Sequence, residues 1–342
     1  MSRIEAALGK LLERTDLDAG EARACCEEIM AGAASEALLG GFLIALRMKG
    51  ETPEEIAAFA AAMRQGARGV PTRQTEIVDT CGTGGDGAGS FNISTAAALV
   101  AAGAGAVVAK HGNRAVSGRC GSADLLAQLG VGIECDDATV GRCLDEAGLG
   151  FLFAPAFHPA MRQAAGVRKA LGVRTVFNLL GPLIHPARAP YQVVGVYESR
   201  WLEPVARALA LLGTRRALVV HGFDGMDEIT TTAATHVAEL DRGAIRTSVL
   251  DARELGIARA APADLAGGDP ARNAAIVSAV LAGESGPRRD IVVVNAAAAL
   301  LVSGVAASFP EGLALAARSL DSGAALAKLN ALRRLTAPAA AG

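Results

Sequence analysis

The sequence is poor in aromatic residues and has no excess of either charge. Aromatic side chains make up 4% of the 342 residues, with a single tryptophan, whereas glycine occurs 40 times. The formal net charge is -2, from 33 basic and 35 acidic residues. Such a balance creates no general attraction for nucleic acid or an anionic membrane, and no local basic patch stands out. We therefore expect neither as a partner.

Cysteine is also scarce, and its spacing excludes two kinds of framework. The six cysteines include no C-x-x-C pair and have no histidine at zinc spacing. They are typical of reduced thiols in a chain large enough to fold without disulfides. The first residues, Met1 to Thr15, carry charges on a helical pattern and lack the apolar core of a signal peptide. We therefore expect a cytoplasmic location.

Long hydrophobic runs are few, and the uncharged stretch from Ile291 to Phe309 is the one that resembles a membrane span. Asn295, Ser303 and Gly304 interrupt it. The β-branched run Ile291–Val294 at its start favours a buried strand that leads into an alanine-rich helix.

The first seventy residues show helical periodicity and no convincing strand. Asp18 with Glu21, and Thr52 with Glu55, have the spacing of capping boxes that open helices. We expect an N-terminal helical domain at 1–72, followed by an α/β domain at 73–342. So short a bundle would bury its remaining apolar face in a second copy, so we expect a homodimer through it, joined by part of 165–190.

Beyond residue 73, apolar β-branched runs alternate with helical patterns. These runs are 77–78, 106–109, 191–197, 217–220 and 291–294. Strands separated by helices predict an α/β fold with a mostly parallel central sheet and surrounding helices. Ligands of such sheets bind at the carboxyl ends of the strands.

The segment 79–95 follows the first of these runs and is rich in glycine and hydroxyl residues. Its glycines are Gly82, Gly84, Gly85, Gly87 and Gly89, and its hydroxyls include Thr83, Ser90, Ser94 and Thr95. Glycines let a phosphate approach backbone N–H groups, and the N-terminus of a following helix adds partial positive charge. We expect that helix to be capped by Asn92, Ser94 or Thr95. The segment predicts a phosphate-binding loop more strongly than a plain surface turn.

Two well-known nucleotide motifs fit this loop poorly. Gly82, Gly84 and Gly87 satisfy G-x-G-x-x-G, but a dinucleotide site would place an acid after the next strand. That strand ends instead in Lys110-His-Gly-Asn-Arg114. No Gly-Lys-Ser/Thr follows the glycines either, which excludes a P-loop.

The 110–122 segment provides a second set of groups suited to phosphate. Lys110 offers a point charge and Arg114 a planar fork, while Asn113, Ser117 and Ser122 supply polar side chains. Alone it would be interpreted as a solvated basic turn. Because it follows the strand after the glycine loop, it is better explained as the facing wall of one site.

Two further groups depend on this context. The adjacent carboxylates of Asp227 and Glu228 suit Mg²⁺, which accepts one or two carboxylates plus substrate phosphates, although adjacent acids also serve as helix-dipole partners. Arg168, on a helix expected to begin at Pro159, suits an aromatic carboxylate, although a surface ion pair is the alternative.

Taken together, these motifs resemble the anthranilate phosphoribosyltransferase family over nearly the whole chain. The residues that carry the resemblance are 82–86 (Gly-Thr-Gly-Gly-Asp), 92–95 (Asn-Ile-Ser-Thr), 110–114 (Lys-His-Gly-Asn-Arg), 121–124 (Gly-Ser-Ala-Asp), 158–161 (His-Pro-Ala-Met), 174–175, 177–182 (Phe-Asn-Leu-Leu-Gly-Pro) and 227–228. The resemblance implies Mg²⁺-dependent transfer of 5-phosphoribosyl from phosphoribosyl pyrophosphate to the anthranilate amine in tryptophan biosynthesis, with two ions per monomer.

The resemblance also implies residue roles. The phosphoribosyl pyrophosphate site would comprise Gly82, Gly85, Asp86, Ser90, Asn92, Ile93, Ser94, Thr95, Lys110, Asn113, Arg114, Ser117, Gly118 and Ser122. Anthranilate would lie against Gly82, Asn113, Pro155, His158 and Arg168. The metals would take Ser94, Asp227 and Glu228, and the catalytic residues would be Lys110, His111, Asn113 and Arg168, with His111 as the candidate base.

Some positions depart from the family pattern. Ser90 replaces the usual Thr, Gly118 and Cys120 replace hydroxyl residues, and His185 stands at a position that is commonly Asn. Two alternatives stay open at this stage. A pyrimidine-nucleoside phosphorylase of related fold would not need the acidic pair, and a non-catalytic nucleic-acid-binding relative would need a basic surface.

Overall fold

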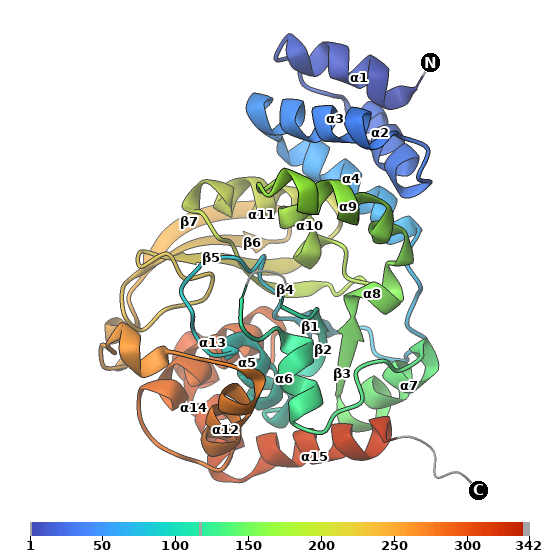
Figure 1. The fold of residues 1–342 in the computed structure, drawn as a ribbon. Coiled ribbons are helices and arrows are strands. Elements are labelled where there is room, and N and C mark those ends of the chain that lie inside the picture. Colours follow the sequence, from blue (N-terminus) through green and yellow to red (C-terminus); the bar gives the residue numbers. More distant parts are fainter. Residues whose placement is uncertain (1, 116–117, 338–342) are drawn as a thin grey trace, which may run out of the picture.

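The computed structural model describes residues 2–115 and 118–337 and contains an N-terminal bundle of helices set on a larger α/β unit (Figure 1). The bundle consists of α1 (Arg3–Leu12), α2 (Ala19–Met30), α3 (Glu36–Lys49) and α4 (Pro53–Gln65). Both predicted capping boxes are present, at the starts of α2 and α4. The buried Glu55 also accepts hydrogen bonds from Leu17 N (2.9 Å) and Lys49 Nζ (2.8 Å), which ties α4 to the preceding segments.

The α/β unit is built on one seven-stranded sheet in the order β3-β2-β1-β4-β5-β6-β7. The strands are β1 (Ile77–Asp79), β2 (Val107–Gly112), β3 (Leu149–Phe153), β4 (Tyr191–Gly195), β5 (Arg216–Gly222), β6 (Thr235–Asp241) and β7 (Ala244–Leu250). β3 to β5 in this order are parallel, and only β6 and β7 are antiparallel. The predicted, mostly parallel α/β sheet is therefore confirmed.

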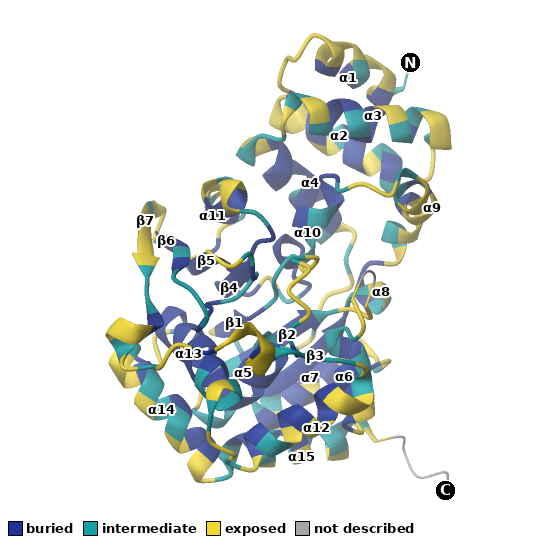
Figure 2. Cartoon of the chain, turned by 60° about the vertical axis from the view of Figure 1, so that its left-hand side comes forward, coloured by how far each residue is buried: buried dark blue, intermediate teal, exposed yellow. Residues whose placement is uncertain are grey.

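Helices cover both faces of the sheet. One face packs against α5 (Ile93–Gly103), α12 (Pro270–Leu281), α13 (Pro287–Val302), α14 (Phe309–Asp321) and α15 (Ala324–Thr336). The other face packs against α11 (Leu202–Leu211), and its apolar core continues through α9 (Arg162–Leu171) and α10 (Phe177–Leu183) into the helical bundle. The shorter helices α6 (Ser122–Gln128), α7 (Asp137–Arg142) and α8 (Ala154–Phe157) complete the β2–β3 end. In Figure 2, α5 and α13 are the most deeply buried helices of the unit.

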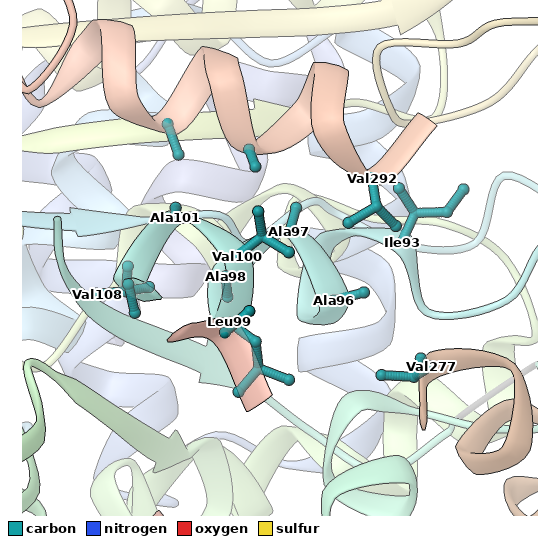
Figure 3. Close-up of a cluster of buried hydrophobic side chains, with 14 of the residues drawn as sticks. Ile93, Ala96, Ala97, Ala98, Leu99, Val100, Ala101, Val108, Val277 and Val292 are labelled. Atoms are coloured by element: carbon teal, nitrogen blue, oxygen red, sulfur yellow. The ribbon is translucent and has the colours of Figure 1, made fainter. Parts of the chain in front are cut away.

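Small side chains let the helices around α5 approach closely. Figure 3 shows Ala97, Ala98 and Ala101 of α5 beside Val108 and Val292. A Cβ added at Gly103 would lie 2.6 Å from the backbone nitrogen of Ala325. Because interiors are close-packed, a larger side chain there has no room.

Two local predictions were wrong. The run Ile291–Val294 is not a strand but part of α13, which begins at Pro287. This part of the helix is buried on all sides, so the sequence shows no alternation of apolar and polar residues at helical spacing. α13 is 16 residues long, and none of the helices in the described ranges has the length and hydropathy to cross a membrane.

The second wrong prediction concerns the start of α5. Asn92 stands at the N-cap of α5, but its side chain donates to Cys120 O (3.1 Å) rather than capping the helix.

Substitution Gly103→Ala is expected to lower the free energy of unfolding by about 1–3 kcal/mol, because the new methyl group overpacks the contact between α5 and α15. Urea denaturation followed by circular dichroism measures the change. Gly9→Ala is the matched control, because no atom lies within 4 Å of its Cβ position on the exposed side of α1. That change should instead stabilise by about 0.5–1 kcal/mol, and equal effects at both sites would contradict the packing argument.

Candidate functional site

Four loops meet at the carboxyl edge of the parallel strands. β1 lies between β2 and β4 in the sheet. The chain adds β2 and β3 on one side of β1 and then adds β4 and β5 on its other side. In open α/β sheets a ligand site forms where the strand order reverses in this way. The segments after β1, β2, β3 and β5 carry most of the sequence-predicted site residues, in agreement with the expected position.

The glycine loop after β1 is open and shaped by left-handed backbone. Positive φ angles occur at Gly84 (67°), Gly85 (75°), Gly87 (75°) and Gly89 (66°), and no atom lies within 4 Å of a Cβ built on any of them. Its far end is fastened by Phe91 N to Leu265 O (3.1 Å) and Gly267 N to Gly89 O (2.9 Å). The loop is therefore anchored at its end, and there is open space where side chains would stand on these four glycines.

The acidic pair lies directly against this loop. Gly84 N donates to Asp227 Oδ2 (2.8 Å), and Ser94 N donates to Glu228 Oε1 (3.1 Å). Asp86 joins the same group, because its Oδ2 accepts from Asp227 N (3.3 Å). A Cβ at Gly82 would lie 2.7 Å from Asp227 Oδ2, so glycine is required there for the two loops to touch. Ser94, Asp227 and Glu228, predicted as one metal site, are thus brought together.

The surroundings of the acidic pair disfavour the ionised form of both carboxyl groups. Burial, with the nearby Asp86 carboxylate, raises the pKa of Asp227 to about 7, and burial with Asp227 raises the pKa of Glu228 to about 8. No three His, Cys, Asp or Glu side chains form a metal cage within 2–115 and 118–337. Mg²⁺ needs no such cage, because it takes one or two carboxylates plus water and substrate phosphates. The donor set fits that ion.

Lys110 lies beneath the glycine loop rather than in the open. Its side chain is buried, and Nζ donates to the carbonyl oxygens of Thr80 (3.0 Å) and His111 (3.4 Å). The positive charge of Lys110 also lowers the pKa of Glu228, against the larger effect of burial. The ammonium therefore supports the base of the loop and offsets part of the acidic charge.

The loop after β2 forms an adjoining wall, but Arg114 is not free in it. Its guanidinium pairs with Asp124 (3.2 Å) and Glu134 (3.5 Å). Asn113 is exposed, and its carbonyl accepts from Ala123 N (3.1 Å) and Ser122 Oγ (3.4 Å). Gly118 is exposed as well, while Ser117 lies outside the described residues.

Two buried histidines lie side by side behind this wall, with ring centroids 5.5 Å apart. His111 Nδ1 lies 3.1 Å from Gly181 O, so Nδ1 carries the proton and Nε2 keeps a lone pair. Nε2 of His111 and of His158 are both buried without a partner in the described residues. Burial lowers the pKa of His111 well below 6.5 and that of His158 to about 4. Both rings are neutral at pH 7.

Arg168 on α9 is a half-buried cation without a carboxylate partner in the described part of the chain. Its guanidinium lies over the Phe177 ring, 5.2 Å from the centroid, and burial lowers its pKa. The alternative of a surface ion pair is therefore wrong. Pro155, at the start of α8, is exposed near the same end of the sheet.

Sequence reasoning assigned no role to three residues that hold the site together. Asp79, fully buried at the end of β1, accepts from His111 N (3.1 Å). A Cβ at Gly195 would overlap the carbonyl oxygen of Asp227, so only glycine lets β4 end against the acidic loop. Gly181 O holds His111. Of these three residues, only Asp79 had a signal in the sequence, namely an acid at the end of a strand.

His185, which departs from the family pattern, has a structural role, because its Nε2 contacts Ala109 O (2.8 Å) and its Nδ1 accepts from Ala189 N (3.4 Å).

Comparison with known proteins identifies relatives over the whole chain. Residues 74–326 match the glycosyl transferase family α/β domain, and residues 5–67 match the helical bundle domain of the same family. The anthranilate phosphoribosyltransferase of Anaeromyxobacter dehalogenans is 56% identical over 96% of this chain and 97% of its own length.

Solved structures agree. The anthranilate phosphoribosyltransferase of Thermus thermophilus is 46% identical, with a TM-score of 0.92 over 98% of this chain and 99% of that one. The Saccharomyces cerevisiae enzyme, solved in complex with PRPP and Mg, is 29% identical with a TM-score of 0.89 over 97% of each chain, and it was also solved with 4-fluoroanthranilate. The chain belongs to the anthranilate phosphoribosyltransferase family.

Proposed function

We propose that the chain transfers the 5-phosphoribosyl group from phosphoribosyl pyrophosphate to the amine of anthranilate, releasing pyrophosphate, as a step of tryptophan biosynthesis. The observation that carries this proposal is the junction of the open glycine loop with the acidic pair, through Gly84 N to Asp227 Oδ2 and Ser94 N to Glu228 Oε1. A loop suited to binding phosphate therefore lies next to carboxylates suited to binding a cation. The ligands named for the yeast relative support the same substrates and ion.

For the donor, we propose contacts along the glycine loop and the wall beside it. The residues are Gly82, Gly85, Asp86, Ser90, Asn92, Ile93, Ser94, Thr95, Lys110, Asn113, Arg114, Ser117, Gly118 and Ser122. Support comes from the left-handed glycines, which leave open space where side chains would stand and so let a phosphate approach the backbone. Arg114 already pairs with Asp124 and Glu134, so it would contribute through long-range charge or by exchanging partners.

For the metal, we propose two Mg²⁺ ions per monomer, held by Ser94, Asp227, Glu228 and the substrate phosphates. The two carboxylates face different parts of the loop, Asp227 at Gly84 and Glu228 at Ser94, which supports two positions rather than one. When bound, Mg²⁺ would neutralise charge that builds on the leaving pyrophosphate. Burial, and after it the neighbouring carboxylates, raise the pKa of both acids, so a bound cation would favour their ionised forms.

For the acceptor, we propose that Arg168 binds the anthranilate carboxylate, with Gly82, Asn113, Pro155 and His158 lining the site. The unpaired, half-buried guanidinium of Arg168 supports this role. Neutral His111 would take the proton that the amine loses through its unpartnered Nε2. The amine itself is the nucleophile, so the remaining catalysis is positioning and charge stabilisation.

Two broader assignments complete the proposal. We place the domain boundary at residue 72, with 1–72 as the helical domain and 73–342 as the transferase domain. We place the protein in the cytoplasm, a choice supported by its six free cysteines.

The function is tested by mixing the protein with Mg²⁺, phosphoribosyl pyrophosphate and anthranilate and following the loss of anthranilate fluorescence. Asp227→Asn/Glu228→Gln keeps the side-chain volumes but removes the charges, and it is expected to slow the reaction by about a hundredfold or more, because charge stabilisation at the leaving group is lost. Glu203→Gln, an exposed acid on α11, is the control. Unchanged fluorescence with the wild-type protein would overturn the acceptor assignment.

Arg168→Met is expected to raise KM for anthranilate about tenfold or more while KM for phosphoribosyl pyrophosphate changes little, because a charge-assisted contact to the acceptor is lost. Initial-rate measurements with each substrate varied separately check this. Lys169→Met, the exposed neighbour on α9, is the matched control. A rise in KM for the donor alone would show that Arg168 serves phosphate instead.

We also propose a homodimer formed through the helical bundle. Leu12 at the end of α1 is 72% exposed and Met48 in α3 is 70% exposed, which leaves large apolar side chains on this small unit without partners in the chain. Leu12→Glu/Met48→Glu should convert a dimeric mass to a monomeric one in sedimentation velocity. Val249→Glu, at a 55% exposed residue of β7, should leave the mass unchanged. A monomeric wild-type protein would contradict the proposal.

A further inference from the structure

A cavity away from the glycine loop lies where the helical bundle meets the α/β unit. It has a volume of about 430 Å³ and lies between α4, the C-terminal end of α11 and the segment before β4. Two arginines, Arg64 and Arg188, line it, and the described residues contribute no carboxylate to its lining. A cavity of this size is within the range that holds small ligands.

Two hydrogen bonds hold the Arg64 side chain in place beside the cavity. From α4, its Nε donates to Leu183 O (2.6 Å) and its Nη1 donates to Leu212 O (3.2 Å). The third nitrogen, Nη2, is buried and has no partner in the described residues. No salt bridge to Arg64 occurs within the described ranges, although a buried charge normally requires one.

Arg188 adds a second positive charge beside the first. It is exposed and holds a left-handed backbone with φ 49°, which is uncommon for a residue other than glycine. Its amide donates to His185 O (2.9 Å), which fixes the turn that presents it. Burial, followed by the charge of Arg188, lowers the pKa of Arg64 to about 10, so Arg64 remains charged at neutral pH and is repelled by Arg188.

We propose that this cavity is a binding site for a small oxyanion, a phosphate or carboxylate group held between the side chains of Arg64 and Arg188. Guanidinium groups match the geometry of both oxyanions, and a bound anion would balance the charge of Arg64, which has no salt bridge within the described residues. It would also remove the repulsion between the two arginines.

The site is distinct from the proposed transferase centre but physically connected to it through α10. Arg64 holds the carbonyl of Leu183 at the end of α10, and Gly181 of the same helix holds His111. An anion on Arg64 therefore binds next to a helix whose other contact orients a residue of the acceptor pocket.

Isothermal titration calorimetry of the full chain with inorganic phosphate, and separately with malonate, tests the proposal. Wild-type protein and Arg207→Ala, an exposed arginine of α11 paired with Glu203, should bind one more equivalent than Arg188→Ala and Arg64→Met, or bind at least tenfold more tightly. Phosphate also suits the glycine loop, so the difference between wild type and these variants, whose loop is intact, is the deciding quantity. Whichever of the two anions shows that difference identifies the group that the cavity takes.

Equal stoichiometry and affinity in all four proteins, or no such difference with either anion, would overturn the proposal. If Arg64→Met does not fold, Arg188→Ala alone decides, because its side chain is exposed and its loss removes no buried contact.

Discussion

The hydrogen bond from the Gly84 amide to the Asp227 carboxylate is the contact on which the candidate site depends. It joins the loop after β1 to the loop after β5, two segments separated by β4 in the sheet. The contact is possible only because Gly82 and Gly195 have no side chains, since a Cβ at either would meet Asp227. Glycine here is a requirement of the approach between loops as much as of turn geometry.

Charge is distributed around this contact in a consistent way. The acids Asp86, Asp227 and Glu228 gather on one side of the loop, and Lys110 lies underneath it. Farther along the sheet edge the groups become neutral or cationic, with His111, His158 and Arg168. This order suits a polyanionic donor with its cation at one end and a flat, carboxylate-bearing acceptor at the other.

The fold was predictable where local pattern and burial agree. The strands that carry the site loops, β1, β2, β4 and β5, are short apolar runs followed by polar turns, and the capping boxes located α2 and α4. The strands β3, β6 and β7 were missed, and β3 and β7 are the two edges of the sheet. β7 in particular is largely exposed, so it lacks an apolar run. Ile291–Val294 was misassigned because a helix buried on all sides has no polar stripe to reveal its period.

The site was predictable as a set of residues but not as a geometry. Sequence motifs predicted that Lys110 and Arg114 bind phosphate. The Lys110 side chain lies under the loop, and Arg114 is paired with Asp124 and Glu134. Side-chain direction depends on neighbours distant in the chain, such as the carbonyl of Thr80 for Lys110, and no local pattern encodes it. The role of Gly195 was hidden for the same reason, since its contact is with a residue on another loop.

The open glycine loop has a consequence for how the protein exchanges hydrogen with solvent. Within the described residues, the amides of Gly85, Asp86 and Gly87 have no hydrogen-bond acceptor, whereas those of Thr83 and Phe91 on either side do. Amides that lack an internal acceptor take up deuterium without any opening of the fold. A ligand that accepts hydrogen bonds from this loop would therefore slow hydrogen exchange at three consecutive residues, while the exchange of their neighbours would stay unchanged.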